Sequence, residues 1–125
     1  MYPTDWHYSK DHEWIRPDGE EVKIGITDFA QQELGDIVYV ELPEAGTEVK
    51  AGDTLGTIES VKAVSEIYAP VSGTVQAVND SLDEAPESIN KDPHGDGWYC
   101  TLKLADASEL DGLMDAAGYE KLIAN

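Results

Sequence analysis

The chain has 125 residues, enough for one domain with a small appendage, and 41% of them are hydrophobic, which suffices for an ordinary core. Twenty-six acidic residues against eight basic ones give a formal net charge of −18, spread along the sequence. Such a surface repels phosphate backbones and anionic lipids, so we expect neither a nucleic-acid nor a membrane partner. It would instead attract a partner protein that carries a basic patch.

The composition also argues against several kinds of site. Cys100 is the single cysteine, which excludes an internal disulfide, and no Cys/His cluster has the spacing of a metal site. Cys100 itself is most simply a small buried residue. No apolar run approaches a membrane span, and the N-terminus lacks the features of a signal or transit peptide. We expect a cytoplasmic protein, although a mature mitochondrial form that begins at a new Met1 would look the same.

The N-terminal segment predicts a β-hairpin followed by a short helix. Residues 6–16 and the alternating residues 21–26 flank Pro-Asp-Gly at 17–19, a sequence typical of a turn. Thr27, or the residue after it, is a suitable cap for a short helix that Gly35 would end.

The middle of the chain predicts a series of short strands separated by frequent turns. These strands are expected at residues 37–40, near 49, and at 54–59, 64–68 and 73–78. Short strands at this spacing indicate a small sandwich or flattened barrel, not a parallel sheet with crossover helices. The fold class is therefore mostly β.

The C-terminal part adds short helices and one further strand. Residues 83–90 have the composition of a helical turn or two, 91–97 of a loop, and 98–104 of a strand. Two amphipathic stretches, 108–114 and 115–123, predict a helical C-terminal segment over about 107–124. Because no Pro/Gly/Ser-rich linker interrupts the sequence, we expect one domain over residues 1–125.

Lys62 is the residue to which we assign function. It is the only basic residue between positions 51 and 90, which hold seven acidic residues. It belongs to a turn at residues 60–63, between two alternating stretches that would pair as a hairpin. This turn lacks the Asn-Gly or Gly-X sequence of ordinary tight hairpins. A lysine at such a tip is accessible to an acylating enzyme, and acylation would remove its charge and make it a long tether.

The region around Lys62 resembles the lipoylation segment of the glycine cleavage system H-protein family. The resemblance is carried by residues 58–73 and, in the same order as in the family, by residues 10–14, 25–30, 34–43 and 90–98. It implies a barrel-sandwich hybrid fold, like that of lipoyl and biotinyl carriers, with short peripheral helices. It also implies lipoate in amide linkage on Lys62, with Glu59, Ser60, Val61 and Ala63 as the flank that the attaching enzyme recognises.

The resemblance implies a carrier, not an enzyme. In that family, a pyridoxal-phosphate-dependent glycine decarboxylase loads an aminomethyl group from glycine onto the lipoyl arm. A tetrahydrofolate-dependent aminomethyltransferase removes the group, and a flavin- and NAD-dependent dihydrolipoyl dehydrogenase reoxidises the arm. These three enzymes and a lipoate-attaching enzyme are the expected partners, and we expect the carrier to be a monomer.

Two carboxylates are candidates for contact with the loaded arm, because an aminomethyl group is cationic. The resemblance brings the region of Glu13 toward the arm, and Glu66 is four residues from Lys62. The alternative is that both are ordinary solvated surface charges. His12 and Trp14 are candidates to shape the same cleft, although a core position is the simpler expectation for Trp14.

Four alternatives to the glycine cleavage carrier are considered: two other carrier domains, a lipoate-relay protein and an enzyme. Biotinyl domains favour methionine on both sides of the lysine, whereas Val61 and Ala63 flank it here. Lipoyl domains of 2-oxo-acid dehydrogenases usually belong to long chains with mobile linkers. A lipoate-relay protein with the same body stays open, since its sequence would look the same. A hydrolytic or metal-dependent enzyme would need a convergent set of acid, base or ligand residues, which the sequence does not offer.

Overall fold

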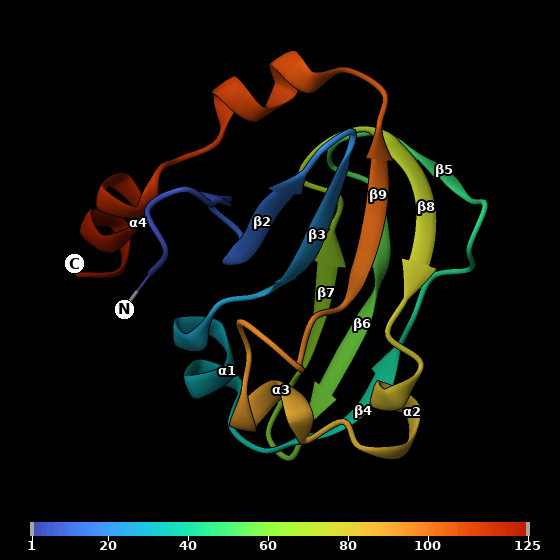
Figure 1. The fold of residues 1–125 in the computed structure, drawn as a ribbon. Helices are drawn as coiled ribbons and strands as arrows, with labels where there is room; N and C mark the ends of the chain where they lie inside the picture. Colours follow the sequence, from blue (N-terminus) through green and yellow to red (C-terminus); the bar gives the residue numbers. More distant parts are fainter. Residues whose placement is uncertain (1, 125) are drawn as a thin grey trace.

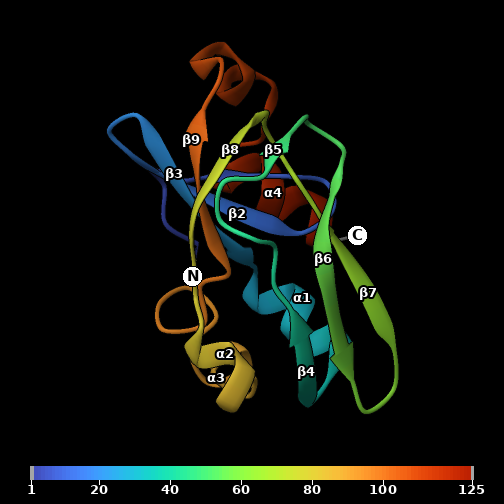
Figure 2. The same cartoon turned by 90° about the vertical axis from the view of Figure 1, so that its right-hand side faces the viewer.

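The computed structural model describes residues 2–124, which form two antiparallel sheets packed face to face (Figures 1 and 2). The larger sheet contains, in spatial order, β1 (His7–Tyr8), β2 (Glu13–Asp18), β3 (Glu21–Ile26), β9 (Cys100–Leu104), β8 (Gly73–Val78) and β5 (Glu48–Val49). The smaller sheet contains β4 (Ile37–Glu41), β6 (Thr54–Ser60) and β7 (Val64–Tyr68). All strand pairs are antiparallel, which confirms a mostly β fold without parallel crossovers.

The main core lies between these two sheets. Ile24 and Leu102 from the larger sheet belong to the same buried cluster as Ile58 and Ile67 from the smaller one. Each of these side chains is at most 2% exposed. Alternating burial along the strands removes one face of each sheet from water, which is the dominant stabilising term for such an arrangement.

The first hairpin differs in one detail from its prediction. The sequence places the end of the strand at Pro17, but β2 continues through Asp18, and Gly19, at φ 67°, makes the turn. β1 pairs with β2 only as far as Ile15. Pro17 therefore lies where β2 is an edge strand, and a missing backbone donor is tolerated there.

Three short helices lie at one end of the sandwich, the lower end in Figure 1. They are α1 (Asp28–Leu34), α2 (Ser81–Glu84) and α3 (Ser88–Lys91). The Thr27 hydroxyl accepts from the Ala30 N–H at 3.2 Å, and Gly35 ends α1 at φ 79°, so both predicted signals of α1 are confirmed. The segment predicted at 83–90 forms parts of two helices, with Pro86 between them.

The C-terminal segment crosses the end of the sandwich opposite α1 and returns beside β1 (Figure 1). It contains the 3₁₀ helix η1 (Ala107–Gly112) and α4 (Ala116–Ile123). The Glu109 carboxylate fastens η1 to the body by accepting from the Ser72 N–H and hydroxyl at 2.8 and 3.0 Å. Within residues 2–124, no helix is long and apolar enough to cross a membrane.

Candidate functional site

The connection between β6 and β7, here called the tip (residues 60–63), is held by Ser60. Its hydroxyl accepts from the backbone N–H groups of Lys62 and Ala63 at 3.3 and 3.1 Å, and its own N–H donates to the Ala63 carbonyl at 2.8 Å. A serine that bonds backbone groups two and three residues ahead replaces the Asn-Gly turn that the sequence lacks. The tip is therefore ordered without glycine.

The tip is also fastened to the rest of the small sheet. The Val61 N–H donates to the Asp36 carbonyl at 3.0 Å, and Ile37 pairs with Ser60 across β4 and β6. Ser60 is buried, whereas Val61 and Lys62 are exposed. The backbone of the tip is thus fixed, while the Lys62 amine is open to a modifying enzyme.

A cavity of about 230 Å³, here called the cleft, lies between α1 and the smaller sheet. Its polar lining consists of Asp11, His12, Glu13, Glu33, Ser65 and Glu66, and the apolar lining includes Leu34 at the end of α1. The structure thus brings Glu13 and Glu66 into one cavity, although they are far apart in the sequence. Lys62 is not among its lining residues.

Glu13 is not a solvated surface charge, because its side chain is only 1% exposed. The Ser9 hydroxyl donates to Oε1 at 2.7 Å, and the Tyr68 N–H donates to Oε2 at 3.0 Å. Burial raises the pKa of Glu13 to about 7 against the lowering effect of these two hydrogen bonds, and the nearby charge of Asp11 raises it further. A cation that enters the cleft would favour the ionised form of this carboxyl group.

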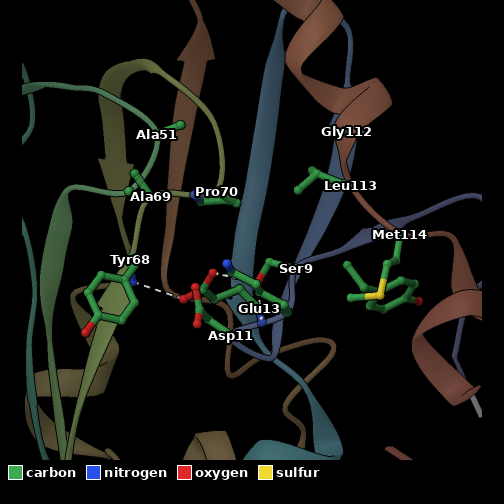
Figure 3. Close-up of a pocket in the computed structure, with 13 residues that line it drawn as sticks. Ser9, Asp11, Glu13, Ala51, Tyr68, Ala69, Pro70, Gly112, Leu113 and Met114 are labelled. Carbon is green, nitrogen blue, oxygen red and sulfur yellow. Dashed lines mark hydrogen bonds between the residues drawn. The ribbon is translucent and has the colours of Figure 1, made fainter. Parts of the chain in front are cut away.

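A second cavity, of about 540 Å³, shares Glu13 and Asp11 with the cleft. Figure 3 shows the Glu13 side chain reaching toward the backbone of Tyr68 in this cavity, with Ser9 and Asp11 beside it. The two acidic residues therefore lie where the cavities meet. The sequence analysis did not single out Asp11 as a site residue; its signal was its place within residues 10–14, one of the segments that carry the family resemblance.

Glu66 is exposed, and its Oε2 accepts from the Tyr68 hydroxyl at 2.9 Å. This bond raises the pKa of Tyr68, since it favours the protonated phenol. Glu59 is exposed on the outer face of the smaller sheet, where it pairs with Tyr39 on one side and Val64 on the other. Glu59 is therefore placed beside the tip, not in the cleft.

His12 lines the cleft, and a residue from the far end of the chain holds its ring. His12 has a φ of 70°, and its Nδ1 lies 2.8 Å from the hydroxyl of Tyr119 in α4. Tyr119 also contacts the Thr27 hydroxyl at 2.6 Å, and burial lowers the pKa of His12. Trp14, in contrast, is fully buried and donates to the Pro93 carbonyl at 2.9 Å, so it is a core residue.

Burial of Glu13 predicts a pH-dependent cost to stability. Between its usual value of 4.5 and about 7, the folded protein keeps a proton that the unfolded chain has lost, so the free energy of unfolding falls as the pH rises. The full cost, about 3 kcal/mol, is present above the folded-state pKa. Glu13→Gln removes the charge, and its amide can still accept from Tyr68 and donate to Ser9. We therefore expect the variant to be more stable than the parent above neutral pH.

Urea unfolding of both proteins at about pH 4 and about pH 8 measures this effect. The stability advantage of Glu13→Gln should grow between the two pH values. Glu66→Gln, at an exposed position lining the same cleft, is the matched control and should follow the parent at both. Parallel curves for Glu13→Gln and the parent would show that Glu13 carries no buried charge.

The protein thus combines two β-sheets, an exposed lysine at a hairpin tip whose backbone is fixed by hydrogen bonds, and an acidic cleft beside that tip. This is the architecture of a carrier protein that bears its transferred group on a side chain. Residues 6–125 match the family model described as Glycine cleavage H-protein. The chain belongs to the glycine cleavage H-protein family, whose members are carrier proteins and not catalysts. The resemblance noted in the sequence is thereby confirmed.

Relatives from bacteria and an archaeon match almost the entire chain. The glycine cleavage system H protein of Anaeromyxobacter sp. (strain K) is 53% identical over 121 residues, covering 97% of this chain and 94% of its own. The probable H protein of Haloarcula marismortui is 54% identical over 121 residues, covering 97% and 95%. The crystal structure of the Mycobacterium marinum H protein superposes with a TM-score of 0.90 at 38% identity, covering 99% and 100%. The expected barrel-sandwich hybrid fold is confirmed.

Proposed function

We propose that this protein is the lipoyl carrier of a glycine cleavage system and that lipoate is attached to Lys62 through an amide bond. The observation that carries the proposal is the tip itself, where Ser60 orders the backbone and leaves the lysine exposed. When bound, lipoate supplies a disulfide whose sulfurs accept and release the aminomethyl group. We propose that residues 1–125 act as one carrier domain.

The residues around Lys62 fit an attached arm. Val61 and Ala63 are exposed and uncharged, so an attaching enzyme can approach the amine on both sides without displacing an ion pair. Glu59 and Ser60 complete the proposed recognition flank, Glu59 as an exposed charge and Ser60 as the buried residue that holds the backbone. The Lys62 stem lies along Gly35 at the end of α1, the helix that forms one wall of the cleft.

The cleft supplies the proposed contacts for the loaded arm. A cationic amine is stabilised beside carboxylates in a partly dry cavity far more than in water. Glu13 is buried and readily exchanges its proton near neutral pH, while Glu66 lies at the exposed side of the same cavity. Glu13 would release its proton as the cation enters and form the inner contact, and Glu66 would form the outer one.

The surface around the tip suits brief docking to several enzymes. Four of the five large hydrophobic side chains that are exposed among the described residues, Val38, Tyr39, Val61 and Val64, lie on the tip or on the strands beside it. A small apolar contact area surrounded by acidic residues is typical of a transient interface. Charge attraction speeds association with the partner, and the complex dissociates quickly.

The proposed partners are the glycine decarboxylase, the aminomethyltransferase, the dihydrolipoyl dehydrogenase and the lipoate-attaching enzyme. Tethering makes each transfer intramolecular once the carrier has docked, so weak docking does not limit the chemistry. We propose a monomer, which leaves the tip free for each enzyme in turn. Because the relatives are bacterial and archaeal, we propose a cytoplasmic location.

The intact mass of the protein from its own host, followed by peptide mapping, tests this function. We expect a lipoyl increment on the peptide that contains Lys62. A biotinyl increment would assign the protein to the carboxylases. If Lys62 stays unmodified after incubation with lipoate, ATP and a lipoate ligase, the carrier proposal is wrong. Reconstitution of glycine cleavage with the three enzymes then separates the shuttle from a lipoate-relay role.

A further inference from the structure

The side chain of Asn90, on α3, holds the short connection between α1 and β4. Its Oδ1 accepts from the Ile37 N–H at 2.8 Å, and its Nδ2 donates to the Gly35 carbonyl and to Gln31 Oε1, each at 2.9 Å. Both amide hydrogens and the amide oxygen are therefore used. These bonds fix the backbone on both sides of Asp36.

The backbone that Asn90 fixes is the one on which the tip rests. The Asp36 carbonyl accepts from the Val61 N–H at 3.0 Å, one residue before Lys62. Gly35 has no side chain there, and a Cβ built on it would lie 3.3 Å from Lys62 Cε and 3.9 Å from Cδ. The methylene stem of Lys62 therefore lies directly over Gly35. A bulkier residue at this point would crowd the stem.

We propose that Asn90 is a positioning residue for Lys62 and sets the direction in which the attached arm leaves the tip. Asn90 makes no contact with the lysine; it acts through residues 35–37, which support both the backbone of the tip and the stem of the side chain. For the identity of the attached group, the inference rests on the proposed function. The placement of Lys62 itself does not depend on that function.

The end of α1 over which the Lys62 stem lies is next to the cleft. Leu34, adjacent to Gly35, lines the cleft, as does Ala30 one turn earlier on α1. Because the stem lies over Gly35, an arm attached to Lys62 starts beside α1, whose Ala30 and Leu34 line the cleft together with Glu13. A stem that has lost this support would sample solvent in all directions. Asn90 thereby reduces the conformational freedom that the arm must lose on entering the cleft.

Asn90→Asp is the most direct variant. It keeps the acceptor for the Ile37 N–H but places a carboxylate oxygen against the Gly35 carbonyl and Gln31 Oε1, where an amide donor is required. Asn79→Asp is a matched control. The Asn79 amide also donates to two carbonyls, those of Asp96 and Trp98, and neither lies at the tip.

The readout is the contact between Lys62 and Gly35 in solution. In the parent apoprotein, we expect a nuclear Overhauser effect between the Lys62 ε-methylene and the Gly35 α-protons. Asn90→Asp should lose this signal, and the catalytic efficiency of lipoylation at Lys62 should fall by about tenfold, because misplaced reacting groups lose rate. Asn79→Asp should keep both. If Asn90→Asp keeps the contact and the rate, the inference is wrong.

A second variant covers the case in which Asn90→Asp does not fold. Asn90→Ala removes all three bonds without placing a charge against the Gly35 carbonyl, so it should shift the Lys62 ε-methylene resonance and slow lipoylation. No change in either measurement would overturn the inference. The outcomes also separate this inference from the proposed function. A parent protein that shows the Lys62–Gly35 contact but is never lipoylated contradicts the function and leaves the positioning intact.

Discussion

Lys62→Arg is expected to abolish lipoylation and, with it, all support of glycine cleavage in a reconstituted system, while the fold is unchanged. Arginine keeps the length and the positive charge of the side chain, but its guanidinium is not acylated by an enzyme that acts on an amine. Lys62 is exposed, and arginine can keep the contact between the stem and Gly35, so the substitution should not affect stability. Intact mass and the rate of glycine cleavage measure the two effects.

Lys50→Arg is the matched control for this variant. Lys50 is also exposed and lies next to a turn, but outside the tip. The Lys50→Arg protein should acquire the lipoyl increment on Lys62 and support glycine cleavage like the parent. A lipoyl increment that persists in Lys62→Arg would place the attachment on another lysine and contradict the assignment of Lys62.

Gly56→Ala is expected to have the largest effect on stability. A Cβ at this position in β6 would overlap both the Tyr99 hydroxyl and the backbone carbonyl of Glu41, which are hydrogen bonded to each other. Because one overlapping atom belongs to the backbone of β4, rotation of a side chain cannot relieve the strain. We expect a loss of more than about 4 kcal/mol, a large part of the 5–15 kcal/mol typical of a whole domain.

Chemical denaturation of the variant measures this loss. Gly112→Ala is the control, since a Cβ there would meet no atom within 4 Å and the residue has no positive φ, and it should stay within about 0.5 kcal/mol of the parent. Combining Gly56→Ala with Tyr99→Phe should cost less than the two single changes together, because one of the two overlaps is removed. A Gly56→Ala protein as stable as the parent would contradict the close packing of β4, β6 and Tyr99.

The elements that the sequence predicted well are those specified by neighbours along the chain. Thr27 and Gly35 delimit α1 through contacts within three or four residues, and alternating hydrophobicity placed the strands on both sides of the tip. The lysine at residues 60–63 follows from the same local pattern. The prediction was wrong where the end of a strand depended on its neighbouring strand, as at the predicted end of β2 at Pro17.

The environment of each site residue was decided by contacts across the fold. Glu13 accepts a hydrogen bond from the backbone N–H of Tyr68, 55 residues away, and His12 is held by Tyr119, 107 residues away. Asn90 supports the tip through residues 35–37, more than 50 positions earlier.

The sequence by itself therefore determined the β-strand pattern and the ends of α1, and through the family resemblance it supplied the candidate lysine for modification. The tertiary structure alone decided which carboxylate is buried, which residues meet in the cleft and what holds the lysine stem. The physical reason is the distance along the sequence over which each kind of interaction acts. Capping, turn formation and alternation act over a few residues, whereas desolvation and side-chain hydrogen bonding depend on which distant segments the packed sheets bring together.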